Sequence, residues 1–141
     1  MLRSLQENEK HLISEDPVRP HIPYEKRFGD GRNVVVLEKD GKIAAIVCTA
    51  LCSNVPSNEE QMFQYADPYG DVLVAYTVWS YSKGAGREII NMLRDSAIDE
   101  KCDRLVTLSP LTEMAERFHI KNGAVFLAKY DKCQNFEYHI N

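Results

Sequence analysis

The most constraining feature of this chain is a β-branched and aromatic run that leads into a glycine turn and then into an amphipathic segment. Residues Asp71–Ser80 (DVLVAYTVWS) have the composition of a buried strand, and Gly84 and Gly86 mark the turn after it. Arg87–Glu100 then places apolar side chains at helical spacing, and Asp103–Ser109 (DRLVTLS) is typical of a strand. Strand, turn, helix and strand form a βαβ unit, whose two strands we expect to be parallel.

A hairpin is predicted before this unit. Asn33–Glu38 (NVVVLE) and Ile43–Leu51 (IAAIVCTAL) are β-rich runs, and Asp40–Gly41 between them is a strong turn dipeptide. Met1–Glu15 has leucines at roughly helical spacing, which predicts a short amino-terminal helix. Pro17–Arg32, with three prolines and two glycines, favours an extended crossing or a loop.

The carboxy-terminal part predicts one helix and two closing strands. Leu111–Asn122 places Leu111, Met114, Ala115 and Phe118 on one face, and Gly123 follows as a helix stop. The strands are expected within residues 124–131 and 135–140, and the polar residues 53–70 are expected as an insertion over the sheet. We therefore expect a single domain over residues 1–141.

Composition narrows the function classes. A chain of 141 residues with 44% hydrophobic content can bury one core. The net charge of −4 lacks the basic surplus that drives nucleic-acid binding, and the longest apolar stretch, Ile43–Cys52, is too short to span a membrane. No histidine or cysteine spacing indicates a metal. We expect reduced thiols in a cytoplasmic protein, with a Cys48–Cys52 redox pair as the alternative.

The glycine turn has the chemistry of an anion site. Backbone N–H groups of Lys83–Arg87 would point outward at a helix amino terminus, where they can hold a pyrophosphate. Gly84 and Gly86 remove the side chains that would keep an anion away, while the flanking Lys83 and Arg87 add positive charge. A tight structural turn is the alternative for the same residues.

With Tyr81–Gly86 (YSKGAG) at its centre, the element order resembles the GCN5-related N-acetyltransferase (GNAT) superfamily, which binds acyl-coenzyme A (acyl-CoA). The family's turn reads Arg/Gln-x-x-Gly-x-Gly/Ala, so Tyr81 departs from it. The resemblance implies an α/β (α+β) acyltransferase fold: a mixed, mostly antiparallel central sheet flanked by helices, with a βαβ unit that binds CoA. In the family, a Tyr four residues before a helix-ending Gly protonates the departing thiolate, and His119 stands in that place before Gly123.

Three stretches resemble the carboxy-terminal catalytic part of malonyl-CoA decarboxylases more closely. Val74–Ser80 (VAYTVWS) is similar to that family's strand before the phosphate turn, and Val106–Pro110 (VTLSP) matches its Thr-Leu-Ser-Pro motif. Ala115–Ala124 (AERFHIKNGA) is similar to its Arg-Phe-His-x-x-Asn-Gly-Ala motif. The resemblance covers roughly residues 33–141 and implies that Ser109 and His119 are a catalytic pair.

Each candidate residue also has a structural interpretation. Ser109 and Pro110 suit a helix start, and His119 suits a half-buried side chain bonded to the backbone. A continuous helix would separate Ser109 from His119 by about 15 Å, whereas a loop after Ser109 would bring them closer. Thr112 either caps the helix or contacts pantetheine. The expected cofactor-binding residues are Val78, Trp79, Ser82, Lys83, Gly84, Ala85, Gly86, Arg87 and Thr112.

The leading hypothesis is an acyl-CoA-dependent acyltransferase that uses acetyl-CoA or another acyl-CoA, in which His119 handles the proton. Its acceptor is expected to carry an amine. Glu59 and Glu60 are either a solvated pair of carboxylates or part of a lid that such a substrate would favour. The alternatives are a malonyl-CoA decarboxylase-like lyase that uses Ser109 and His119, and a non-catalytic CoA-binding or protein-binding module. The oligomeric state stays open, with a homodimer among the options.

Overall fold

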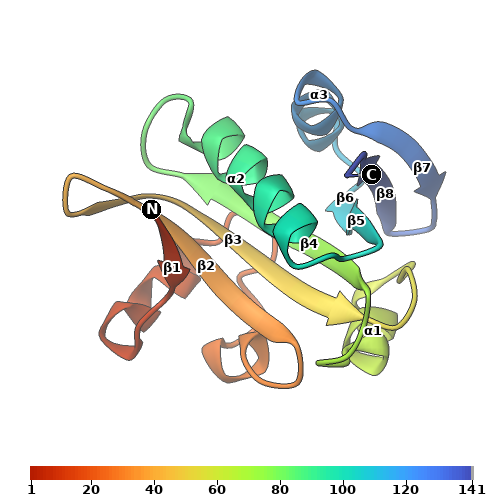
Figure 1. Ribbon diagram of the computed structural model, residues 1–141, viewed down its shortest axis with the longest axis horizontal. Helices are drawn as coiled ribbons and strands as arrows, with labels where there is room; N and C mark the ends of the chain where they lie inside the picture. Colours follow the sequence, from red (N-terminus) through yellow and green to blue (C-terminus); the bar gives the residue numbers. More distant parts are fainter. Residues whose placement is uncertain (141) are drawn as a thin grey trace.

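The computed structural model describes residues 1–140, which form one eight-stranded sheet covered on both faces (Figure 1). The strands run in the order β1-β2-β3-β4-β5-β8-β6, with β7 on the other edge of β8. They are β1 (Leu2–Ser4), β2 (Arg32–Lys39), β3 (Lys42–Cys52), β4 (Val72–Ser80), β5 (Arg104–Thr107), β6 (Ser109–Pro110), β7 (Val125–Lys129) and β8 (Cys133–Tyr138). The helices are η1 (Glu7–Glu15) and η2 (Tyr24–Arg27), both 3₁₀, and α1 (Glu59–Tyr65), α2 (Ala85–Asp99) and α3 (Glu113–Lys121).

The hairpin and the βαβ unit are confirmed. β2 and β3 pair antiparallel up to Lys39 and Lys42, and the turn residues Asp40 (φ 53°) and Gly41 (φ 76°) are both left-handed, as a two-residue hairpin turn requires. β4 and β5, which precede and follow α2 in the chain, pair parallel, and every other strand pair described is antiparallel. The observed sheet is therefore mixed and mostly antiparallel, as expected.

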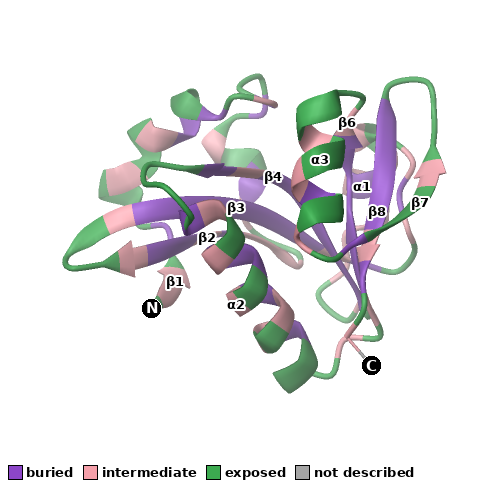
Figure 2. Cartoon of the chain, turned by 90° about the horizontal axis from the view of Figure 1, so that it is seen from above, coloured by how far each residue is buried: buried purple, intermediate pink, exposed green. Residues whose placement is uncertain are grey.

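The core has two layers, one on each face of the sheet. α2 covers one face with Ile89, Ile90 and Leu93, which pack against the side chains of β3, β4 and β5 that point to it. On the other face, Ile13 of η1 and Met62 of α1 pack against the opposite side chains of the same strands. Figure 2 shows the buried sheet between helices whose outer faces are exposed. The hydrophobic effect of these two layers holds the sheet in place.

The predicted amino-terminal helix is wrong in part. Residues Leu2–Ser4 form the edge strand β1, which pairs antiparallel with β2, and only Glu7–Glu15 are helical, as the 3₁₀ helix η1. The leucines that suggested one helix belong to two elements: Leu2 lies in β1 and Leu12 lies in η1. The buried Leu5 lies between them. The tertiary pairing of β1 with β2 thus overrides the local helical pattern.

All four cysteines are free thiols. Cys48 and Cys52 are buried, and burial raises the pKa of each thiol to about 12. Both thiols are therefore protonated near neutral pH, and the redox pair considered from the sequence is not formed in this structure.

Candidate functional site

A cleft opens where β4 and β5 part. Their parallel pairing ends at Ala75 and Thr107, and the last backbone hydrogen bond between the two segments runs from Leu108 N to Ala75 O (3.0 Å). The chain then enters β6, which pairs with β8 instead. The register between β3 and β4 also shifts here, because Cys48 opposes Thr77 while Thr49 opposes Ala75, so Tyr76 is the extra residue of a β-bulge. The β5-side edge of residues 76–80 is left without a strand partner.

The cleft has a volume of about 620 Å³ and is bordered by four parts of the chain. These are β4, the first turn of α2, the segment from Ser109 into α3, and Pro17 and Val18. It brings together six of the predicted site residues: Val78, Trp79, Gly86, Ser109, Thr112 and His119. The remaining predicted residues, Ser82, Lys83, Gly84, Ala85 and Arg87, lie in the turn and helix start next to Gly86.

The cleft lining is neutral and largely apolar. Among its described lining residues no aspartate, glutamate, lysine or arginine occurs. The apolar face predicted for the helix at 111–122 exists on α3 in Met114, Ala115 and Phe118, and it borders the cleft: Met114 is 82% exposed, and Ala115 and Phe118 are only partly buried. An exposed apolar helix face over an open strand edge is suited to an elongated ligand.

At one end of the cleft, the start of α2 offers backbone donors. Gly84 is the cap residue with a left-handed φ of 82°, and no side chain caps α2 within the described chain. Ala85 N donates to Ser82 O (3.2 Å), and helix geometry leaves the next N–H groups, those of Gly86 and Arg87, without partners inside the helix. Lys83 and Arg87 are exposed beside them. The turn therefore has the donors and the charge of an anion site.

Tyr81, which departs from the family pattern, is fixed by the amino-terminal region. Its hydroxyl donates to Glu15 Oε1 (2.6 Å) and accepts from Trp79 Nε1 (2.9 Å). Burial, followed by the hydrogen bond to Glu15, raises the pKa of Tyr81 to about 12. Tyr81 thus holds Trp79 in place at the cleft and ties the end of β4 to η1.

His119 lies on α3 at the cleft, and it is buried rather than half-buried. Its Nδ1 is 2.7 Å from the Tyr138 hydroxyl, and its ring is stacked on Phe136. Burial lowers the pKa of His119 to about 4, so the imidazole is uncharged at pH 7. When Tyr138 donates to Nδ1, the ring proton sits on Nε2, which is the nitrogen left for the cleft.

Ser109 shares the cleft with His119, and it does not cap the helix as the sequence also allowed. Ser109 and Pro110 form β6, and Thr112 is the cap, accepting from Ala115 N (3.2 Å). Ser109 Oγ lies 2.8 Å from Thr107 Oγ1, which itself accepts from Phe136 N (3.0 Å). When Thr107 is the donor in this pair, the Ser109 proton is free to point into the cleft.

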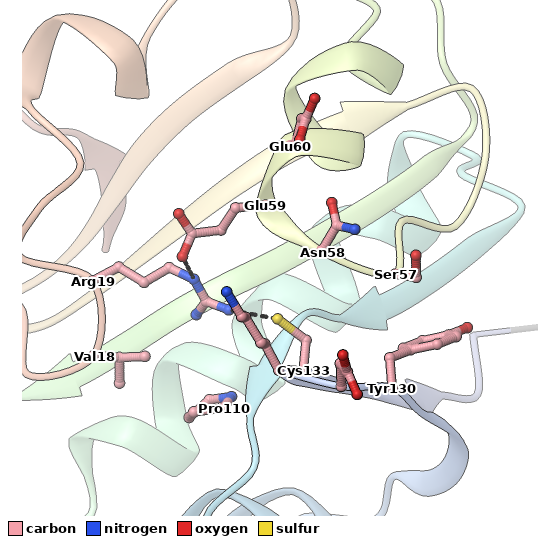
Figure 3. A pocket seen from close by; sticks show the side chains of 11 residues that line it. Val18, Arg19, Ser57, Asn58, Glu59, Glu60, Pro110, Tyr130 and Cys133 are labelled. Carbon is pink, nitrogen blue, oxygen red and sulfur yellow. Dashed lines mark hydrogen bonds and ion pairs between the residues drawn. The ribbon is translucent and has the colours of Figure 1, made fainter.

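A second cavity, also about 620 Å³, adjoins the first (Figure 3). Val18 and Pro110 border both cavities. The second cavity is polar, and Glu59, Glu60, Asp131 and Lys132 contribute to its lining together with Arg19, whose exposed fraction is only 3%. Figure 3 shows the Arg19 guanidinium reaching between Glu59 (Nε to Oε2, 3.0 Å) and Cys133.

Sequence reasoning missed a buried charge network behind Val18. Asp16 accepts from the backbone N–H of Val18 (2.8 Å) and Arg19 (2.9 Å), from Thr77 Oγ1 (2.8 Å) and from Arg27 Nη1 (2.8 Å). The side chains of Asp16 and Arg27 are both 0% exposed. These hydrogen bonds hold the pKa of the Asp16 carboxyl below its usual value although burial opposes them. The Asp-Pro dipeptide at position 16 was the only local sign of such a turn.

The described residues show neither a cluster of metal ligands nor a membrane-spanning helix. Within residues 1–140, no group of three or more histidine, cysteine, aspartate or glutamate side chains is arranged to hold a metal ion. None of the helices described is long and apolar enough to cross a membrane.

Comparison with known proteins identifies the fold. No family model matches the sequence, and no curated protein matches it. Solved structures do match, and they include GCN5 from Tetrahymena (16% identity, 94% of this chain and 84% of that chain, TM-score 0.61). Another is yncA from Salmonella typhimurium with acetyl-CoA (16%, 100% and 94%, TM-score 0.57). A third is the GphF GNAT-like decarboxylase with isobutyryl-CoA (10%, 100% and 100%, TM-score 0.69). The chain has the GNAT acyltransferase fold.

Proposed function

We propose that this protein is an acyl-CoA-dependent acyltransferase that binds the thioester in the neutral cleft and an amine-bearing acceptor in the second cavity. The observation that carries this proposal is the pair of cavities that meet at Val18 and Pro110. One cavity is neutral, largely apolar and lined by Gly86 at the start of α2, and the other is polar and carries carboxylates. Such a pair suits two substrates that react where the cavities meet.

The direction of the thioester substrate follows from the turn. When the pyrophosphate binds to the N–H groups of Gly86 and Arg87, the cleft along β4 is available for the rest of the acyl-CoA. From Ser80 back to the bulge at Tyr76 is four residues of extended strand, or about 13 Å. Backbone groups on the free edge of this stretch can bond the amides of pantetheine, and the thioester then lies near Tyr76, Ser109 and His119. The fold neighbours yncA and GphF, whose structures hold acetyl-CoA and isobutyryl-CoA, support an acyl-CoA as the ligand.

The residues at that end suggest how acyl transfer is assisted. Nε2–H of neutral His119 and the Ser109 hydroxyl can donate to the thioester oxygen as negative charge develops on it. The amine nitrogen bonds to the acyl carbon, the C–S bond breaks, and the thiolate takes up a proton from solvent to give free CoA. Carboxylates in the second cavity, among them Glu60 and Asp131, can accept the proton lost by the amine.

The test begins with binding and continues with turnover. Calorimetric titration with CoA should show binding, and acetyl-CoA with a panel of primary amines should release thiol only when an amine is present. Gly86→Val, which places a branched side chain in the cleft beside Phe118, should weaken CoA binding by at least roughly tenfold, or about 1.4 kcal/mol. Asn91→Val, at an exposed position of the same helix, is the control for helix propensity. Absence of CoA binding by the unmodified protein would refute the proposal.

A second candidate is a decarboxylase that acts on malonyl-CoA, and the convergence of Ser109 and His119 in one neutral cleft favours it. Loss of CO2 breaks a C–C bond and leaves its electron pair in an enolate, which donors such as Nε2–H and the Ser109 hydroxyl would stabilise; solvent then supplies the proton. The fold neighbour GphF is named as a GNAT-like decarboxylase. Conversion of malonyl-CoA to acetyl-CoA without an acceptor would identify this reaction, and thermal protection by CoA without any turnover would indicate a binding module.

A further inference from the structure

We infer that Val18 sets the length of the acyl group that the cleft accepts; this inference rests on the proposed acyl-CoA site but on neither of the two candidate reactions. Val18 is a lining residue of both cavities, and it comes from a segment far in sequence from β4 and α3. An acyl group that continues past the thioester leaves the neighbourhood of Tyr76 and meets the partition to which Val18 and Pro110 contribute. The side chain at position 18 therefore limits the space beyond the thioester.

The backbone at Val18 is held to β4 on one flank by Asp16. A single carboxylate oxygen, Asp16 Oδ1, accepts from Val18 N and from the hydroxyl of Thr77, the residue next to the bulge. The other oxygen accepts from Arg27, whose guanidinium is completely buried. Moving Val18 away from β4 would break bonds to a carboxylate whose side chain is fully buried, which costs far more than a surface rearrangement.

The other flank is held by Arg19. Its guanidinium donates to the carbonyl oxygen of Tyr76, the bulge residue, and to Glu59. Its own carbonyl accepts from Arg27 Nη2 (2.6 Å). Residues 18 and 19 are thus tied to Tyr76 and Thr77, the strand residues at the β-bulge. Val18 is a fixed wall rather than a mobile loop side chain.

The two sides of this wall differ in chemistry. On the cleft side the lining is neutral and largely apolar, whereas behind Val18 lie Arg19, Glu59 and Glu60. A short alkyl chain keeps apolar contacts in front of Val18, and a longer chain either strikes the valine or enters a polar cavity. The structure therefore favours short acyl groups, and the size of residue 18 should decide the limit.

Binding of saturated acyl-CoAs tests this without turnover. We would titrate CoA, acetyl-CoA, butyryl-CoA and hexanoyl-CoA into the unmodified protein and into Val18→Ala, Val18→Ile and Val18→Phe. The readout is the ratio of each acyl-CoA dissociation constant to that of CoA itself. Val18→Ala should extend the preference to longer chains, with about fourfold tighter binding for each methylene newly accommodated. Val18→Ile and Val18→Phe should shorten it in order of size, while the affinity for CoA stays within about twofold.

Val125→Ala is the matched control, because Val125 lies on β7, is 63% exposed and belongs to the lining of neither cavity. It should leave all ratios unchanged. If the unmodified protein binds CoA and the ratios are the same in Val18→Ala and Val18→Ile, the inference is wrong and the acyl group points elsewhere. If the unmodified protein fails to bind CoA, the proposed function itself is overturned and the inference falls with it. Val18→Ile adds only one methylene, so a folding defect in Val18→Phe does not prevent the decision.

Discussion

The two ends of the cleft are built in different ways. The end proposed to bind the pyrophosphate, here called the anion-binding end, is formed by consecutive residues that lead from β4 through Gly84 into α2. The end proposed to hold the acyl group, here called the acyl end, is formed by residues from distant parts of the chain: Val18 from the Asp16–Arg27 segment, Tyr76 from β4 and His119 from α3. The first end depends on backbone conformation and the second on buried side-chain contacts. Damage to the first end should therefore weaken binding, whereas damage to the second should reduce turnover and stability.

The largest expected effect concerns His119. In the proposed function His119 donates a hydrogen bond to the thioester oxygen. His119→Ala removes this donor and should lower the turnover rate by roughly 10²- to 10⁴-fold. CoA affinity should change much less, because the pyrophosphate donors belong to α2. Steady-state turnover and calorimetric titration on the same preparation check both, with His139→Ala, an exposed histidine, as control. Unchanged turnover per folded molecule with a lowered melting temperature would make His119 a packing residue.

The next effect concerns the stability of the acyl end. Asp16→Ala leaves the fully buried guanidinium of Arg27 without its carboxylate, and should lower the free energy of unfolding by about 3–5 kcal/mol. Glu113→Ala removes the partner of Arg117 in an exposed pair on α3, and should cost less than about 0.5 kcal/mol. Urea unfolding of both variants makes the comparison. Equal losses in the two variants would contradict the role given to the buried network.

Acid should also destabilise the acyl end. Burial disfavours protonation of His119 in the folded protein, because it lowers the pKa of the imidazole from the ordinary value of 6.5 to about 4. The unfolded chain therefore binds the proton first as the pH falls below 6.5, and stability is lost from there down to about pH 4. Between pH 7.5 and pH 5 this amounts to about 2 kcal/mol. Urea unfolding at the two pH values should show this loss, and His119→Phe should show less of it; equal losses in both proteins would show that another group titrates.

The smallest expected effect concerns the anion-binding end. Gly84 has a φ of 82° and open space around the position that a Cβ would take, so Gly84→Ala meets only backbone strain. We expect a loss of about 1 kcal/mol in the free energy of unfolding. Thermal unfolding of Gly84→Ala checks it. A loss as large as that of Asp16→Ala would mean that the turn is coupled to the core more tightly than its contacts indicate.

Local patterns were sufficient to predict much of the fold. The Asp40–Gly41 hairpin turn and the helix stop at Gly123 depend on residues near in sequence, so the residue types predict them. The parallel βαβ unit around α2 was predicted from the order strand, helix, strand, for which a parallel pairing is the rule. The local pattern gave the wrong structure where strand pairing determines the conformation. Leu2–Ser4, for example, pairs with β2 at the edge of the sheet. The pattern failed again at Ser109, because β8 offers Ser109 and Pro110 a strand partner and leaves the capping of α3 to Thr112.

The sequence by itself determined the glycine turn, the strand and the helix that surround it, and the identity of Ser109 and His119 as candidates. Only the tertiary structure brought Ser109 and His119 into one cleft, made the imidazole neutral by burying it, and joined Asp16, Arg27 and Thr77 behind Val18. The physical reason is range. Backbone conformation is set by neighbours along the chain, whereas burial, pKa and the fit of a cavity are set by residues that only folding brings together.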